Sequence, residues 1–206
     1  MLTACGEGQP IATPVKIVAF GDSLTAGYQL PANKAMPAIL QERFAQNGHT
    51  GVHIINMGIS GDTTQDGLAR LNLVLNAQPD IVILELGAND ILRQISASKS
   101  RENLEEMIEE LLDRDIRVLL SGVKIPNIYV IGNKNMGDYG AMFDSLSEKY
   151  DIEYYPNFLA GVQGKAEMNL QDGLHPNADG AKGIANRLYP LVLDMAQDVA
   201  KQTQSP

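Results

Sequence analysis

The feature that most constrains the fold is an alternation of short apolar runs with longer amphipathic stretches. The runs are rich in Ile, Val and Leu, and they lie at 16–20, 52–57, 81–86, 117–121 and 152–155. Most do not alternate strictly between apolar and polar residues, which is typical of parallel strands covered on both faces. Helical patterns fill the intervals, so the sequence predicts an α/β fold: a parallel sheet with right-handed crossovers and helices on both faces.

The predicted helix at the centre of the chain has the clearest pattern. Its apolar residues between 104 and 112 fall on one face at helical spacing, and four glutamates lie on the opposite face. Ser98 and Ser100 are the expected caps of this helix. Further helices are predicted at 37–46, at 63–76 with Asp62 as its cap, at 140–149 and at 178–201.

Length and charge limit the organisation of the chain and its partners. The 206 residues suit one domain, which we place at 15–200 between a flexible tether at 1–14 and a tail at 201–206. A net charge of −9 argues against nucleic acid as the main partner, because phosphates attract Lys and Arg. No stretch approaches the roughly 20 apolar residues of a membrane span.

The single cysteine, Cys5, leaves two hypotheses about location open. The segment Leu2-Thr3-Ala4-Cys5-Gly6 resembles the cleavage box of a bacterial lipoprotein, but only Met1 precedes it where a signal peptide should stand. If the start is truncated, we expect a lipid anchor at Cys5 and a periplasmic or envelope-associated protein. If the start is genuine, the match is chance and a cytoplasmic location follows.

Polar, glycine-punctuated turns follow the predicted strands. Ligands of open parallel sheets bind outside the carboxyl ends of the strands, so chemistry is expected in these turns. The first three turns follow strands and the fourth precedes the last helix: Gly21-Asp22-Ser23-Leu24, Asn56-Met57-Gly58-Ile59-Ser60-Gly61-Asp62, Gly87-Ala88-Asn89-Asp90 and Asp172-Gly173-Leu174-His175-Pro176.

Two of these turns together carry the residue types of a nucleophilic serine site. Taken alone, Ser23 is most often a helix cap and His175 a structural loop residue. A serine hydroxyl needs a base to take its proton, and histidine is the natural base near neutral pH. The imidazole in turn needs a carboxylate to fix its tautomer, and Asp172 lies three residues before His175.

The other two turns offer donors for the oxyanion of an acyl-transfer intermediate. The N–H of Gly61 has no side chain blocking its approach, and the Asn89 carboxamide offers two N–H groups. The backbone N–H of Ser23, at a helix start, is the third candidate. Taken alone, Gly61 and Asn89 would be ordinary turn residues. The carboxylates of Asp62 and Asp66 have no nearby third ligand, so no metal site is predicted.

In order and spacing, the four turns resemble the four sequence blocks of the SGNH, or GDSL, hydrolase superfamily. The resemblance spans roughly 15–193 and is greatest to the branch of bacterial thioesterase I, lysophospholipase and arylesterase proteins. It implies a three-layer α/β/α, flavodoxin-like sandwich with a five-stranded parallel sheet, and no metal or organic cofactor. It also implies Ser23 as nucleophile, His175 as general base and then acid, and Asp172 as its partner. The implied oxyanion hole comprises Ser23, Gly61 and Asn89.

One departure from the family pattern affects the substrate. Residues 127–137 form an insertion after the fourth predicted strand, and they would be either a wall or lid for an acyl chain or a loop packed on its own core. The candidate substrate-binding residues are Asp22, Ile91, Ile125, Pro126, Ile128 and Tyr129. Asp22 is also expected to hold the serine turn as a hydrogen-bond acceptor.

The leading functional hypothesis is a serine ester hydrolase that acts on small carboxylic esters or thioesters of short to medium acyl length. Carbohydrate O-deacetylation is the enzymatic alternative, which the lack of Trp and the 5% aromatic content disfavour. A non-catalytic anion-binding or nucleotide-binding domain is the alternative of another class, because Gly21–Gly27 follows a strand and opens a helix. Either a monomer or a small homo-oligomer is compatible with the sequence.

Overall fold

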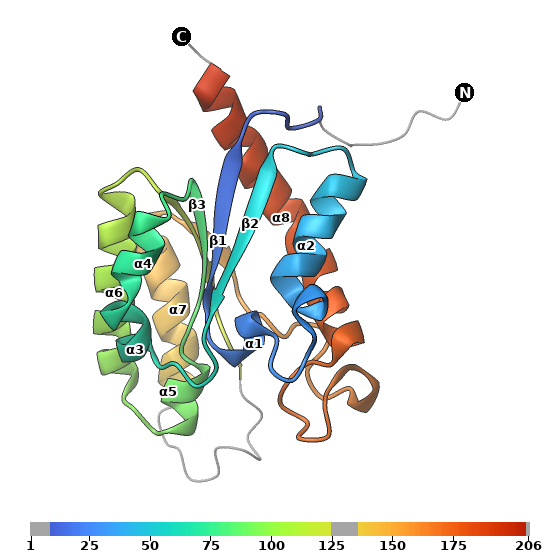
Figure 1. The fold of residues 1–206 in the computed structure, drawn as a ribbon. Helices are drawn as coiled ribbons and strands as arrows, with labels where there is room; N and C mark the ends of the chain where they lie inside the picture. Colours follow the sequence, from blue (N-terminus) through green and yellow to red (C-terminus); the bar gives the residue numbers. More distant parts are fainter. Residues whose placement is uncertain (1–8, 125–135, 205–206) are drawn as a thin grey trace.

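A five-stranded parallel sheet forms the centre of the molecule (Figure 1). The computed structural model of the chain describes residues 9–124 and 136–204. The strand order is β2-β1-β3-β4-β5, which is the flavodoxin-like order. The predicted α/β fold is confirmed, and the strands begin and end within about a residue of the apolar runs: β1 at Val15–Gly21, β2 at Val52–Gly58, β3 at Ile81–Glu85, β4 at Arg117–Ser121 and β5 at Glu153–Tyr155.

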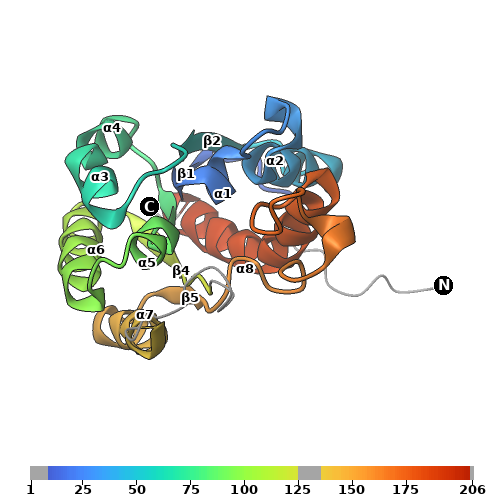
Figure 2. The ribbon, with the colours of Figure 1, turned by 90° about the horizontal axis from the view of Figure 1, so that it is seen from below.

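Helices cover both faces of the sheet, so the molecule has three layers. On one face, α2 (Met36–Gln46) packs against α8 (Ala178–Gln204) and β2. The other face carries α3 (Thr64–Ala69), α4 (Leu71–Asn76), α6 (Ala97–Leu112) and α7 (Met136–Tyr150), as Figure 1 shows. Two short helices, α1 (Ser23–Ala26) and α5 (Ala88–Leu92), lie at the carboxyl end of the strands (Figure 2). Among the described residues there are also two 3-10 turns, Ala32–Lys34 and Ala166–Met168.

The apolar runs form the inner layer of the core. Every residue of β3 is buried, as are four of the five residues of β4. The edge strand β2 is only partly buried, because it has a neighbour on one side alone. Burial of the central strands on both faces explains why their sequences are continuously apolar rather than alternating.

Three predictions about helix starts and ends are wrong. The predicted helix at 63–76 is two helices separated at Arg70, and its cap is Thr63 rather than Asp62. Helix α6 begins after Ser96, whose side chain accepts a hydrogen bond from the N–H of Lys99, so Ser98 and Ser100 lie inside the helix. For the two caps, a neighbouring Asp or Ser offered similar capping chemistry, and the observed caps are those whose side chains accept a backbone N–H three residues later.

The described structure continues on both sides of the predicted domain at 15–200. Ile11 is buried, and its N–H donates to His49 Nδ1 at 3.1 Å, so packing begins before residue 15. At the other end, α8 continues to Gln204. Cys5 lies outside the described residues. Among the described helices, none combines the length and the apolar character that crossing a membrane requires.

Candidate active site

The four polar turns meet at the carboxyl ends of the strands. The sheet reverses its order between β1 and β3, and open α/β sheets bind ligands in the crevice at such a point. The turn after β1 carries Ser23, and the turn after β3 carries Asn89. Figure 2 shows α1 and α5 at this end of the molecule. Residues that are far apart in sequence therefore share one edge.

The serine turn depends on Gly21 and Asp22. A Cβ atom on Gly21 would lie 2.5 Å from the carbonyl oxygen of Glu85, so no larger residue fits where β1 ends. The Asp22 carboxylate then caps α1 by accepting a hydrogen bond from the N–H of Leu24 at 2.9 Å. Ser23 is the first residue of that helix, where a backbone N–H has no partner within the helix.

A hydrogen-bonded relay joins Ser23 to the loop before α8. Ser23 Oγ lies 2.9 Å from His175 Nε2, and His175 Nδ1 lies 2.7 Å from Asp172 Oδ2. The other oxygen of Asp172 accepts the N–H groups of Leu174 at 2.9 Å and His175 at 3.0 Å. The ring of Tyr28 packs on the imidazole with its centroid 4.4 Å away. This arrangement can take a proton from the serine hydroxyl and stabilise the imidazolium that results.

Electrostatics keep the carboxylate of this relay charged. Partial burial raises the pKa of Asp172, but the hydrogen bonds from His175 and Leu174 outweigh it, so the pKa is lower than usual. The carboxylate is therefore ionised at neutral pH, as a partner of an imidazolium must be.

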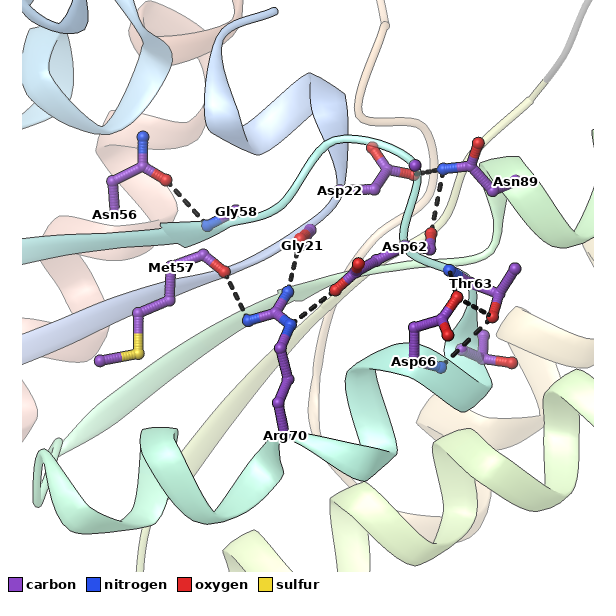
Figure 3. Close-up of polar contacts among 12 residues, drawn as sticks. Gly21, Asp22, Asn56, Met57, Gly58, Asp62, Thr63, Asp66, Arg70 and Asn89 are labelled. Carbon is purple, nitrogen blue, oxygen red and sulfur yellow. Dashed lines mark hydrogen bonds and ion pairs between the residues drawn. The ribbon is translucent and has the colours of Figure 1, made fainter.

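The two oxyanion candidates lie in turns that are bonded to each other. Gly61 adopts φ +93, a left-handed conformation that favours glycine, and its carbonyl accepts a hydrogen bond from Arg93 at 2.7 Å. Asn89 Nδ2 donates to Asp22 Oδ2 at 3.1 Å and to the carbonyl of Asp62 at 2.9 Å (Figure 3). Both hydrogens of the Asn89 amide are thus aimed at the serine turn and the Gly61 turn.

The Arg70 side chain connects the serine turn to the Gly61 turn. Its guanidinium donates to Asp62 Oδ2 at 2.6 Å, to the carbonyl of Met57 at 2.8 Å and to that of Gly21 at 2.9 Å (Figure 3). The group also lies 4.4 Å from the centroid of the Phe20 ring. One planar side chain therefore fixes the ends of β1 and β2 against the Gly61 turn. The sequence pattern assigned no role to Arg70, because all three of its partners lie in other elements or turns.

Two buried acids support the serine turn, Asp22 from within the turn and Glu85 from the end of β3. Burial raises the pKa of Asp22 to about 7, with the negative charge of Asp90 adding to the effect and the hydrogen bond from Leu24 opposing it. Burial and the neighbouring Asp22 raise the pKa of Glu85 well above its usual value. Glu85 Oε2 accepts a hydrogen bond from Thr25 Oγ1 at 2.8 Å. These acids support the turn from the interior.

The structure brings together Ser23, His175 and Asp172, and it places Gly61 and Asn89 in turns joined through Asp62. Asp22 and Ile91, both expected at the substrate, are buried: the Asp22 carboxylate supports Asn89, and Ile91 lies in the core. The remaining substrate-binding candidates lie outside the described residues: Ile125, Pro126, Ile128 and Tyr129.

A small cavity of about 50 Å³ opens beside the relay. Its apolar lining was missed by sequence reasoning, although each lining residue lies within a few positions of a motif residue. It comprises Leu24, Ala88, Leu92 and Leu174, next to Ser23, Asn89 and His175. Within the described residues, no group of three or more His, Cys, Asp or Glu side chains is arranged to hold a metal ion.

Comparison with known proteins decides the family. The model of the GDSL-like lipase/acylhydrolase family matches residues 19–182. The chain belongs to this family. It is a serine hydrolase of ester bonds, which excludes the non-catalytic binding domain as its main function, and the resemblance inferred from the four turns is confirmed.

Individual relatives agree with this assignment over most of the chain. An arylesterase of Vibrio mimicus is 37% identical over 171 residues, covering 82% of this chain and 84% of its own. Thioesterase 1/protease 1/lysophospholipase L1 of Escherichia coli strain K12 is 33% identical over 181 residues, covering 85% and 84%. The crystal structure of TesA superposes with a TM-score of 0.81 at 30% identity, over 87% of this chain and 99% of that one. The SGNH-hydrolase family esterase AlinE4 gives 0.72 at 37% identity, over 89% and 97%.

Proposed function

We propose that the protein hydrolyses carboxylic esters or thioesters of short to medium acyl length through an acyl-Ser23 intermediate. The observation that carries this proposal is the relay in which Ser23 Oγ lies 2.9 Å from His175 Nε2 and His175 Nδ1 lies 2.7 Å from Asp172 Oδ2. These are hydrogen-bonding distances, so the serine proton has an acceptor before any substrate binds.

In the acylation half-reaction, Ser23 Oγ attacks the carbonyl carbon of the ester while its proton moves to His175 Nε2. Asp172 fixes the imidazole with Nδ1 protonated and stabilises the positive charge that develops. The tetrahedral intermediate then collapses, the C–O or C–S bond to the leaving group breaks, and His175 returns the proton to the departing alcohol or thiol. In deacylation, His175 takes a proton from water, the hydroxide attacks the acyl carbon, and Ser23 leaves with the proton.

The oxyanion of each intermediate would be held by the N–H groups of Ser23 and Gly61 and by Asn89 Nδ2. Both hydrogens of the Asn89 amide already have acceptors. Asn89 therefore reaches the oxyanion when it exchanges one of these bonds, and the longer bond, 3.1 Å to Asp22, is the one to yield. The Asn89–Asp62 bond of 2.9 Å then keeps the side chain in place during the exchange.

Support for acyl substrates comes from the cavity and from the names of relatives. The cavity beside Ser23 is lined by aliphatic side chains, which suit an acyl chain better than a sugar. The relatives include an arylesterase, a thioesterase/lysophospholipase and an esterase. An acetylxylan esterase of Geobacillus stearothermophilus is 28% identical over 161 residues, so deacetylation of a carbohydrate remains the second candidate.

A panel of substrates tests the proposal. 4-Nitrophenyl esters and acyl thioesters of graded chain length, together with an acetylated xylan, would be assayed with the wild-type protein and with Ser23→Ala. We expect turnover of the short and medium esters or thioesters and none above background with Ser23→Ala. A wild-type preference for the acetylated xylan would favour the second candidate, whereas hydrolysis retained by Ser23→Ala would contradict the role of Ser23.

An envelope location with a lipid anchor at Cys5 is a separate proposal, supported by the lipoprotein-like box around that residue. Expression of the chain behind a lipoprotein signal peptide, followed by fractionation, compares Cys5 with Cys5→Ser. Membrane association that depends on Cys5 would support the anchor, and an identical distribution of the two forms would contradict it. A monomer or small homo-oligomer remains our expectation, which light scattering measures.

A further inference from the structure

Asp90 is a fully buried carboxylate that the proposed mechanism does not use. It follows Asn89 in α5, and it accepts three hydrogen bonds. Thr64 gives two of them, from its N–H to Asp90 Oδ2 at 2.8 Å and from its hydroxyl to Oδ1 at 2.6 Å. Ser100 Oγ in α6 gives the third, at 2.7 Å to Oδ1.

A second layer of buried polar groups surrounds these partners. Asn103 Nδ2 donates to the Thr64 hydroxyl at 2.9 Å. The Tyr139 hydroxyl lies 3.1 Å from Ser100 Oγ and 2.7 Å from the carbonyl oxygen of Ile95, to which it donates. Buried carboxylates are tolerated only when donors compensate for lost water, and Thr64 of α3 and Ser100 of α6 supply these donors to Asp90. The position of Asp90 is therefore strongly determined.

Capping of α3 does not by itself account for Asp90. That helix already has a complete capping box, in which Asp66 Oδ2 accepts the N–H and hydroxyl of Thr63 and the Thr63 hydroxyl accepts the N–H of Asp66 (Figure 3). The bonds from Thr64 to Asp90 leave the helix and connect its first turn to α5. Two carboxylates thus hold the same helix start, one within α3 and one across to the helix of Asn89.

The connection runs between α5, which carries Asn89, and the first residue of α3, which follows the Gly61 turn. Thr64 lies three residues after Gly61, and Asp90 lies one residue after Asn89. The Asn89 amide also donates to the Asp62 carbonyl, which belongs to the Gly61 turn. Asp90 therefore holds the start of α3, shortly after the Gly61 turn. The placement of an oxyanion donor to within a fraction of an ångström decides its value in catalysis.

We propose that Asp90 is a positioning residue that sets the separation between the Gly61 N–H and the Asn89 amide through its bonds to Thr64. The proposal rests on the oxyanion hole of the proposed function. Loss of the connection would leave Ser23 and His175 in place but would let the two donors move apart. It therefore predicts a loss of transition-state stabilisation with little change in substrate binding.

The test compares Asp90→Asn with Asp66→Ala, which removes the capping box but not the connection to α5. Thr64→Val, which keeps the shape but loses the hydroxyl, is compared with Thr64→Ser, which keeps the hydroxyl. One sample of each full-length variant is titrated with a fluorophosphonate to count its active sites. Values of kcat, per active site, and KM are measured on an unlabelled sample with a 4-nitrophenyl ester. Inhibition by an aryl boronic acid, which forms a tetrahedral adduct, and the melting temperature complete the set.

For Asp90→Asn we expect kcat to fall about 10- to 100-fold, with KM changed less than about twofold and boronate affinity falling in parallel with kcat. Asp66→Ala is expected to lower Tm by about 2–4 °C and to keep kcat. The kcat of Thr64→Val should fall below the wild-type value, and the kcat of Thr64→Ser should equal it. This pair decides the matter if Asp90→Asn does not fold.

Equal kcat values for Asp90→Asn and Asp66→Ala, or for Thr64→Val and Thr64→Ser, would overturn the proposal, because Asp90 would then be only structural. Failure of the underlying function looks different, since the wild-type protein itself would not be labelled by the fluorophosphonate at Ser23.

Discussion

The two halves of the site are built in different ways. The base half is a four-residue loop in which the Asp172 carboxylate contacts the imidazole and backbone of His175 and the N–H of Leu174. The oxyanion half consists of two turns held by side chains from distant elements, including the buried Asp90 and the Arg70 guanidinium. Geometry is therefore local and partly exposed in the base half, but long-range and buried in the oxyanion half.

Because of this difference, we expect substitutions in the two halves to have different effects on activity and on the free energy of unfolding. Substitutions in the base loop remove few long-range contacts, so they should lower activity with little effect on the free energy of unfolding. Substitutions in the oxyanion half leave buried partners unsatisfied, so they should lower both. The following predictions test that expectation, in order of decreasing effect.

The largest effect is expected for His175→Ala. Removing the base should lower kcat for a 4-nitrophenyl ester by about 10⁴-fold. The free energy of unfolding should change by no more than about 1 kcal/mol, because the side chain's hydrogen bonds are with Ser23 and its own loop. Asp172→Asn should lower kcat less. Steady-state kinetics measure kcat, and urea unfolding measures the free energy of unfolding. A large loss of stability in His175→Ala would contradict the local construction of the base half.

Asn89→Ala should lower both quantities. Loss of one oxyanion donor is expected to reduce kcat about 10²- to 10³-fold. The same change leaves Asp22 Oδ2 and the Asp62 carbonyl without the amide, which should destabilise the fold by about 1–3 kcal/mol. Urea unfolding at one protein concentration, alongside His175→Ala, gives the contrast. If Asn89→Ala proved as stable as wild type, the hydrogen bonds from Asn89 to Asp22 and Asp62 would not stabilise the oxyanion half.

Arg70→Lys tests the support without touching a proposed donor. A lysine ammonium cannot span the carbonyls of Gly21 and Met57 and the Asp62 carboxylate as the planar guanidinium does. We expect a loss of about 2–3 kcal/mol in the free energy of unfolding. Arg114→Lys is the matched control, because Arg114 is exposed and pairs with Glu110 one helical turn away. It should change stability by less than about 0.5 kcal/mol, and equal losses in the two variants would contradict a special role for Arg70.

The final prediction concerns the change of stability with pH rather than a loss at one pH. The pKa of Asp22 is about 7 in the folded protein, above its unfolded value of 3.8, so the folded state binds more protons between these values. The stability contributed by protonated Asp22 is complete below pH 3.8 and is lost as the pH rises toward about 7. Asp22→Asn should therefore flatten the decline of stability with pH in this window, as measured by urea unfolding at each pH. A slope that is unchanged by the substitution would refute the assignment.

The contrast between the halves also explains what the sequence could predict. Asp172 and His175 are three residues apart, so their pairing follows from chain geometry alone. The central strands follow from continuous apolar runs, because burial on both faces leaves a direct mark on composition. Gly61 and Asn89 could be placed at one sheet edge, but the bonds that connect their turns could not be derived.

The unpredicted features all depend on long-range contacts. Arg70 interrupts the expected helix at 63–76, where its side chain bonds to the ends of β1 and β2. Ser100 was expected as a helix cap and instead donates to Asp90 inside the core. Asp22 was expected near the substrate, yet it is buried within the serine turn. A short polar side chain has similar local propensity in each setting, so only the tertiary fold decides its partner.

The site of covalent labelling tests most directly whether His175 activates Ser23 as the nucleophile. Wild-type protein would be incubated with a fluorophosphonate and digested, and the modified peptide would be identified by mass spectrometry, with His175→Ala treated in parallel. We expect one adduct, on Ser23, formed far more slowly in His175→Ala. An adduct on another residue, no adduct at all, or equal labelling rates in the two proteins would contradict the claim that His175 activates Ser23.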